Sequence, residues 1–224
     1  MDRRLLSIYN LIDPHAKGLC DVGTDHGMIP IRLALDGFTG DLIAADIKSG
    51  PLSRAEENAL SHSVHDRITF CLCDGIPEHL SGRFDTVVVA GMGGDLICSI
   101  LDKADWIFSD GYTLILQPMT KQEVLRYYLI NNGFFISDDI LAEDSGRIYQ
   151  IIRCRYTGIN DSYSDHELYI GKKGRCPDQE LYSRAAESFR KNLEKIINGC
   201  GSSEDESKRS FYINMAHQLG SKTI

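Results

Sequence analysis

Acidic residues next to glycines, at the ends of short apolar runs, are the side chains of this chain best suited to hold a ligand. The first group spans residues 19–30, where an apolar run ending at Val22 leads into Gly23, Asp25 and Gly27. This spacing predicts a buried strand, a glycine turn and a helix start, the unit that opens nucleotide-binding α/β sheets. Glycine suits such a turn because a backbone that touches a ligand has no room for side chains.

Asp25 narrows the kind of ligand that this turn would accept. A dinucleotide fingerprint, G-x-G-x-x-G, has a bare glycine where the pyrophosphate meets the helix N-terminus. Asp25 stands at the place of the second glycine, so its carboxylate would repel and obstruct a diphosphate. A cofactor that carries a cationic sulfonium and an amine would tolerate or favour that carboxylate. The turn therefore predicts S-adenosylmethionine, and it makes a nicotinamide cofactor the weakest alternative.

Two further acids follow the next two predicted strands. Asp46 comes 23 residues after Gly23, at the end of the apolar run 41–47. This is where α/β sheets place a carboxylate on the ribose hydroxyls of a nucleoside cofactor. Asp74 stands before Gly75, just past the strand 68–73, where it could accept a hydrogen bond from an adenine amino group or be an ordinary turn residue.

A second glycine loop follows the most apolar run of the chain, residues 84–90. The run contains consecutive valines, as expected for a central parallel strand buried on both faces. Residues 91–94 read Gly-Met-Gly-Gly, and open α/β sheets bind ligands outside the carboxyl ends of their strands. We expect this loop to let a flat substrate or the methionine part of the cofactor approach the backbone.

The remaining pattern predicts the elements that position these loops. Strands are expected at residues 19–22, 41–47, 68–73, 84–90 and 112–116, with helices at residues 3–13, 29–35, 52–61, 95–103 and 121–131. The short segment between the strand-like runs 134–141 and 147–154 predicts an antiparallel hairpin. Five parallel strands with intervening helices, completed by such a hairpin, form the α/β, Rossmann-like sheet of class I methyltransferases.

The C-terminal part has a different character. Residues 157–176 are rich in Gly, Asp, Ser and Tyr and predict a linker with one helical turn around Ile170. Helices are expected at residues 176–197 and 204–219, separated by the glycine-rich stretch 198–203, and we expect them to form an αα-hairpin. This divides the chain into a ligand-binding domain, residues 1–157, and a linker with a C-terminal helical substrate-binding part, residues 158–224.

The composition sets further limits. The 224 residues carry a net charge of −8 and are 42% hydrophobic, which is typical of a globular domain and unlike a highly basic nucleic-acid binder. We expect no membrane span, no signal peptide and a cytoplasmic location. Seven scattered cysteines without zinc spacing predict buried, reduced thiols and no metal site.

Six short motifs together resemble the bacterial tRNA (adenine(22)-N1)-methyltransferase family. They are Asp21-Val-Gly-Thr-Asp-His-Gly-x-x-Pro30, Gly50-Pro51-Leu52, Asp74-Gly75, Ala90-Gly-Met-Gly-Gly94, Leu116-Gln-Pro118, and Glu143-Asp144 followed by Tyr149. The resemblance covers residues 3 to about 156. It implies an S-adenosylmethionine domain, a C-terminal coiled-coil-like part linked to tRNA binding, and methyl transfer to N1 of an adenine, A22, in tRNA. The C-terminal part departs from the family in being short, glycine-broken and neutral, with 10 basic and 10 acidic residues in 158–224.

The resemblance also implies residue roles. The expected cofactor-binding residues are Asp21, Gly23, Thr24, Asp25, Asp46, Ile47, Asp74, Gly75, Ala90, Gly91 and Met92. Methylation leaves a positive adenine, so a nearby carboxylate would stabilise it or accept a proton from N6. Asp25 is the candidate for that role, with His26 as its hydrogen-bonding partner.

A tRNA partner would require basic residues against its phosphates. The candidates are Arg3, Arg4, Lys172, Lys173, Arg175, Arg190 and Lys191. Two alternatives stay open: a small-molecule methyltransferase on the same fold, which fits the acidic charge, and a non-catalytic protein that binds S-adenosylmethionine and RNA. We expect a monomer.

Overall fold

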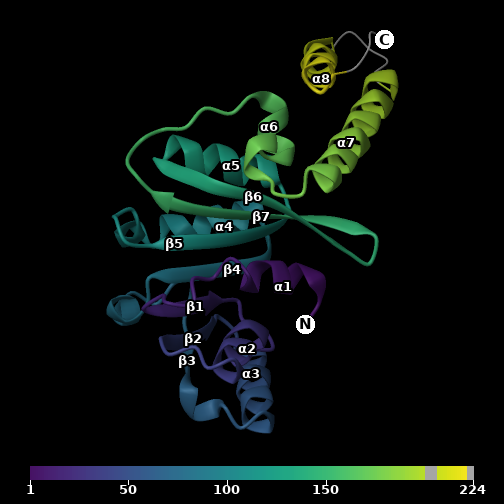
Figure 1. The fold of residues 1–224 in the computed structure, drawn as a ribbon. Helices are drawn as coiled ribbons and strands as arrows, with labels where there is room; N and C mark the ends of the chain where they lie inside the picture. Colours follow the sequence, from purple (N-terminus) through teal and green to yellow (C-terminus); the bar gives the residue numbers. More distant parts are fainter. Residues whose placement is uncertain (200–205, 221–224) are drawn as a thin grey trace.

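A seven-stranded sheet organises the chain, with the strand order β3-β2-β1-β4-β5-β7-β6 (Figure 1). The structure is a computed structural model that describes residues 1–199 and 206–220. The strands are β1 (Gly18–Val22), β2 (Asp41–Asp46), β3 (Ile68–Leu72), β4 (Thr86–Gly93), β5 (Thr113–Thr120), β6 (Phe134–Asp144) and β7 (Arg147–Tyr156). The first five run parallel, and β7 pairs antiparallel with both β5 and β6. The predicted class I methyltransferase sheet is confirmed.

Helices cover both faces of this sheet. The helices of the described residues are α1 (Arg3–Tyr9), α2 (Met28–Leu35), α3 (Ser49–Ser61), α4 (Gly94–Asp102), α5 (Gln122–Asn131), α6 (Asp165–Ile170), α7 (Gln179–Gly199) and α8 (Glu206–Gln218), of which α1 to α5 pack on the sheet. Short 3-10 turns lie at His65–Arg67, Glu78–Arg83, Asp105–Ile107 and Lys173–Arg175. No helix among the described residues is long and apolar enough to span a membrane.

The core has two layers because successive strand residues point to opposite faces. On β4, Val87 and Val89 pack with the apolar faces of α4 and α5, whereas Val88 packs with α1 and α2. All three valines are fully buried. This two-sided burial holds the carboxyl ends of the central strands at one edge of the sheet.

Several predicted boundaries were wrong by a few residues, among them the end of the strand 112–116 and the start of the helix 52–61. Two of the errors have a clear local cause. Residues 91–93, predicted as loop, continue β4, because β4 stays paired with β5 as far as Gly93 and Thr120, across a register shift at Met92. The first helix ends at Tyr9 instead of residue 13. The chain after it turns more tightly, with Leu11 N–H donating to Ile8 and Ile12 N–H donating to Tyr9.

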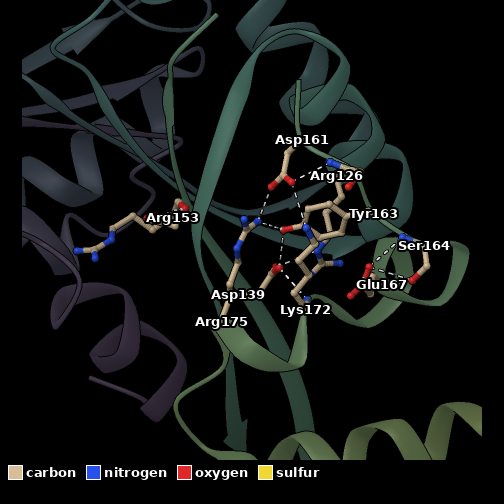
Figure 2. A network of polar contacts seen from close by, with 11 residues as sticks. Arg126, Asp139, Arg153, Asp161, Tyr163, Ser164, Glu167, Lys172 and Arg175 are labelled. Carbon is tan, nitrogen blue, oxygen red and sulfur yellow. Dashed lines mark hydrogen bonds and ion pairs between the residues drawn. The ribbon is translucent and has the colours of Figure 1, made fainter. Parts of the chain in front are cut away.

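The segment 158–176 is bound to the sheet domain through a buried polar network. We call it the Asp139 network, and Figure 2 shows its members, Arg126, Asp139, Asp161, Tyr163, Lys172 and Arg175. At its centre Arg126 Nε donates to Asp139 Oδ1 over 2.9 Å, and both side chains are about 1% exposed. The hydroxyl of Tyr163 and the backbone N–H of Lys172 donate to the other carboxylate oxygen, at 2.9 and 3.0 Å. The predicted linker is therefore packed in place, and its helical turn is α6.

The later turns of α7 pack with α8 away from the sheet (Figure 1). Their shared core contains Leu193, Ile197, Met215 and Ala216. The first turn of α7 packs on the sheet, where Leu181 and Tyr182 contact Leu141 of β6. The predicted start of the second helix at Glu204 and the glycine-rich break at 200–203, with Cys200, lie outside the described residues. The six cysteines that are described are free, and five of them are buried.

Candidate active site

Two adjoining cavities open at the carboxyl ends of the central strands. The first, the strand-end cavity, has a volume of about 360 Å³ and is bounded by Asp46, Ile47, Asp74, Met92 and Leu96. The second, the α1 cavity, measures about 240 Å³ and is bounded by Arg4, Asp21, Thr24, His26 and Met28. Gly23, Asp25, Ala90 and Gly91 line both cavities and separate them. The structure thus brings both predicted glycine loops to one place.

The first loop folds tightly at the end of β1. The backbone N–H groups of Gly23 and Thr24 both donate to the carbonyl of Ala45 on β2, over 2.8 and 3.2 Å. Gly23 has φ +74°, and a Cβ atom there would lie 2.0 Å from the methyl group of Met92. Met92 therefore covers this turn from β4, a contact that the sequence did not predict.

Asp21 is the buried acid of the loop. Its carboxylate accepts a hydrogen bond from the Thr24 hydroxyl over 2.7 Å and is 5% exposed. Burial raises the pKa of the Asp21 carboxyl from 3.8 to about 6; the Thr24 hydrogen bond opposes this shift and the nearby charge of Asp46 adds to it. Asp21 also lines the α1 cavity.

This shifted pKa predicts a pH-dependent stability in the ligand-free protein. Because the folded state holds the Asp21 proton more tightly than the unfolded state, the free energy of unfolding should fall as pH rises from about 4 to about 6, by about 2–3 kcal/mol, and then level off. Asp21→Asn should remove this component. Urea unfolding of both proteins at pH 4.5 and pH 7 would measure it, and an equal pH dependence in the two would contradict the prediction.

Asp25 is exposed at the mouth of both cavities, and His26, which is also exposed, lines the α1 cavity. Asp25 adopts φ 42° and forms an ion pair with Arg54 of α3, with 2.5 Å between Nη2 and Oδ1. The Nε2 atom of His26 lies 3.6 Å from the other oxygen of Asp25. The sequence reasoning did not identify Arg54, which balances the charge that was expected to repel a diphosphate. Asp25 lies at the turn as predicted, but its negative charge is balanced by the guanidinium of Arg54.

The other predicted cofactor residues line the strand-end cavity. Asp46 is 8% exposed, and its Oδ1 accepts the backbone N–H of Lys48 over 2.8 Å. Asp74 is exposed, and its Oδ2 accepts a hydrogen bond from Lys103 over 2.6 Å. Ile47 is 61% exposed and gives the cavity an apolar rim.

The cavity has apolar lining residues that the sequence reasoning missed. Leu96 and Ile100, one turn apart on α4, lie in its wall together with Cys73. Their neighbours Ile97 and Leu101 already fill the core-facing side of the helix. The apolar face of α4 is wider than its packing on the sheet requires, and this width could have predicted that Leu96 and Ile100 line a cavity.

The basic residues predicted to bind RNA differ in their surroundings. Lys172 and Arg175 form ion pairs with Asp161 inside the Asp139 network. Arg190 pairs with Glu187 and Glu194 along α7, and Lys191 also reaches Glu187. Arg4 donates to Gln117 at the α1 cavity. Arg3 and Lys173 are exposed like Lys191 but, unlike it, form no ion pair with another described residue, so they are the most available of the seven to a phosphate.

The described residues contain no cluster of three or more His, Cys, Asp or Glu side chains able to hold a metal ion. The groups that line the cavities are carboxylates, glycine backbone, apolar side chains and the basic side chains of Arg4, His26 and Lys48. These groups suit a nucleoside in the strand-end cavity and a flat polar molecule in the α1 cavity.

Comparison with known proteins agrees with this arrangement. Residues 1–152 match the family model described as "Methyltransferase domain". The tRNA (adenine(22)-N(1))-methyltransferase of Bacillus subtilis (strain 168) is 27% identical over 171 residues, which cover 76% of this chain and 71% of that protein.

Two solved structures share the fold over almost the whole chain. TrmK of M. capricolum, in complex with S-adenosyl-homocysteine, has a TM-score of 0.81 at 23% identity and covers 98% of this chain and 96% of its own. The m1A22 tRNA methyltransferase TrmK of B. subtilis has a TM-score of 0.80 at 20% identity, with 98% and 97% covered. At these identities the two structures establish the fold.

Proposed function

The chain belongs to the methyltransferase domain family, and from this premise we propose that it transfers a methyl group from S-adenosylmethionine to N1 of an adenine in tRNA, A22. The observation that carries the proposal is the pair of cavities that meet at Gly23, Asp25, Ala90 and Gly91. A methyl donor and an acceptor must approach within contact distance, and two adjoining cavities with a shared backbone wall allow this.

The strand-end cavity fits the cofactor by its chemistry. Oδ1 of Asp46 accepts the backbone N–H of Lys48, and the other carboxylate oxygen would accept hydrogen bonds from ribose hydroxyls. Ile47, Leu96 and Ile100 offer an apolar slot of the kind that covers an adenine ring. When bound, S-adenosylmethionine supplies an electrophilic methyl group on a sulfonium cation.

The α1 cavity would receive the target adenine. The N1 lone pair would bond to the methyl carbon as the carbon–sulfur bond breaks and the neutral thioether leaves, so the protein would form no covalent bond and would contribute mainly alignment. Asp25 lies at the entrance to both cavities, where its carboxylate would stabilise the positive charge that methylation leaves on the base or accept a proton from N6. The His26 ring, 3.6 Å from Oδ2 of Asp25, would help to position this carboxylate.

Asp25→Ala should lower kcat about tenfold and change the Kd for S-adenosylmethionine less than threefold. The effect is moderate because the carboxylate is exposed and already paired with Arg54, and an exposed charge is worth about 1 kcal/mol at contact distance. Steady-state kinetics and calorimetry would measure the two quantities. Equal losses in kcat and in cofactor affinity would reassign Asp25 to cofactor binding.

Incubation with methyl-labelled cofactor and unmodified tRNA tests the proposed activity, followed by mapping of the labelled base. Label at N1 of A22 is the expected result. Label in a small molecule and none in tRNA would favour the small-molecule methyltransferase, and cofactor binding without any transfer would favour a non-catalytic role.

We propose that Arg3 and Lys173 contribute phosphate contacts to tRNA binding. Lys173→Ala should reduce the slope of log Kd for tRNA against log salt by about 0.7–0.9, the value of one phosphate contact. Arg175→Ala is the control, because the Arg175 side chain is paired with Asp161 and lies 4.7 Å from the centre of the Phe135 ring. This variant should lower the free energy of unfolding and leave the salt slope of tRNA binding unchanged. Binding measured from 50 to 200 mM salt would decide, and an unchanged slope for Lys173→Ala would remove it from the interface.

A further inference from the structure

Arg4 on α1 turns inward to the α1 cavity. Its Nη1 donates to Oε1 of Gln117 over 2.8 Å, and its guanidinium lies 5.8 Å from the centre of the Tyr149 ring. The Arg4 side chain is only 20% exposed. Arg3, one residue earlier, is exposed. The two adjacent arginines therefore have different surroundings, although the sequence predicted the same phosphate-binding role for both.

Gln117 links Arg4 to Gly91, in the glycine-containing end of β4. It is fully buried, and the same Oε1 atom also accepts the backbone N–H of Gly91 over 3.2 Å. Its Nε2 donates to the carbonyl of Pro118 over 2.9 Å. A rotated amide would present Nε2 to two donors, so the positive charge of Arg4 holds the orientation in which Gln117 can bind Gly91.

The Ala90–Gly91 peptide that is held in this way is part of the wall between the two cavities. Because a trans peptide is planar, its N–H and C=O point in opposite directions. Drawing the Gly91 N–H toward Gln117 on β5 turns the Ala90 carbonyl toward β1, on the other side of β4. The end of β1, at Gly23, borders both cavities, so the orientation of this peptide shapes the place where donor and acceptor meet.

We infer that Arg4 is a positioning residue for methyl transfer, acting through Gln117 on the Ala90–Gly91 peptide. This inference rests on the proposed function, because it concerns the alignment of the proposed donor and acceptor. It differs from the phosphate-contact role in what it requires of the side chain. A phosphate contact needs a positive charge, whereas positioning Gln117 needs a guanidinium of the right length and plane.

Kinetics of Arg4→Lys and Arg4→Met separate the two roles. Positioning predicts that both variants lower kcat about tenfold, the cost of about one charge-assisted hydrogen bond, while the Kd for cofactor and the salt slope of tRNA binding stay near wild type. A phosphate contact predicts that Arg4→Met has a higher KM and a smaller salt slope of tRNA binding, and that Arg4→Lys, which keeps the charge, has values near wild type. Arg3→Met is the neighbouring comparison and should change KM and the salt slope only.

Amide hydrogen exchange of Gly91 gives a second measurement that needs no activity. Arg4→Met should accelerate exchange of the Gly91 amide about tenfold, with cooperative unfolding retained, and Arg3→Met should leave it unchanged. Unchanged Gly91 exchange or wild-type kcat in Arg4→Met would overturn the inference. If the wild-type chain transfers no label to tRNA, the proposed function fails, and the exchange comparison still decides whether Arg4 holds this peptide.

Discussion

Asp46→Ala should weaken binding of S-adenosylmethionine about 100-fold, the largest effect on affinity that we expect from one side chain of the site. Asp46 is 8% exposed at the end of β2 and lines the strand-end cavity. Two hydrogen bonds from ribose hydroxyls to a carboxylate, each worth about 1.5–3 kcal/mol, justify a loss of this size. Isothermal titration calorimetry would measure the Kd.

Asp74→Ala is the matched control, because Asp74 borders the same cavity. Its carboxylate is exposed and bound by Lys103, so the loss of affinity should stay below about tenfold. Asp46→Asn keeps one acceptor oxygen and should fall between wild type and Asp46→Ala. A Kd for Asp46→Ala within threefold of wild type would show that the ribose is held elsewhere. Thermal unfolding of each variant checks that loss of the Asp46–Lys48 hydrogen bond has not unfolded the loop.

Arg126→Met should lower the free energy of unfolding by about 3–5 kcal/mol. The substitution leaves the Asp139 carboxylate buried, and among the described residues its remaining partners are the Tyr163 hydroxyl and the Lys172 N–H. Removing one member of a buried ion pair costs this much because the remaining charge stays out of water. Loss of the hydrogen bond from Arg126 to the carbonyl of Leu168 adds to the cost.

Arg184→Met is the control for Arg126→Met. Arg184 makes two hydrogen bonds to Glu143, but its side chain is 55% exposed, and such surface pairs are worth about 0–1 kcal/mol. Urea unfolding of the two variants would give both free energies. If Arg126→Met were no more destabilising than Arg184→Met, the buried pair would not be a major contributor to stability.

The order of elements was readable from the sequence because its signals are local. Apolar runs ending in an acid or a glycine marked β1 to β4, and Asn132-Gly133 marked the end of α5. The same signals identified both glycine loops and Asp46. Strand ends were less certain, because β4 and β5 extend beyond their apolar runs only through pairing with each other.

The partners of the site residues were not predictable in the same way. Arg54 and Arg4 reach Asp25 and Gln117 across 29 and 113 positions of sequence. Neither arginine belongs to a motif of fixed spacing, and from the sequence each would be predicted to be an exposed charge on a helix. The Asp139 network is similar, because Arg126 looks like one more polar residue of α5 until the fold buries it.

The Asp139 network also sets where the chain can be cut. A truncation after residue 157, the boundary suggested by composition, would remove the Tyr163 hydroxyl and the Lys172 amide that serve Asp139, and would strip cover from α5. Limited proteolysis should therefore spare 158–176. The first turns of α7 belong to the same folded unit, because Leu181 and Tyr182 pack with Leu141, Ile170 and Cys176. The smallest unit that folds on its own would then include α7 as far as Phe189 and end before α8.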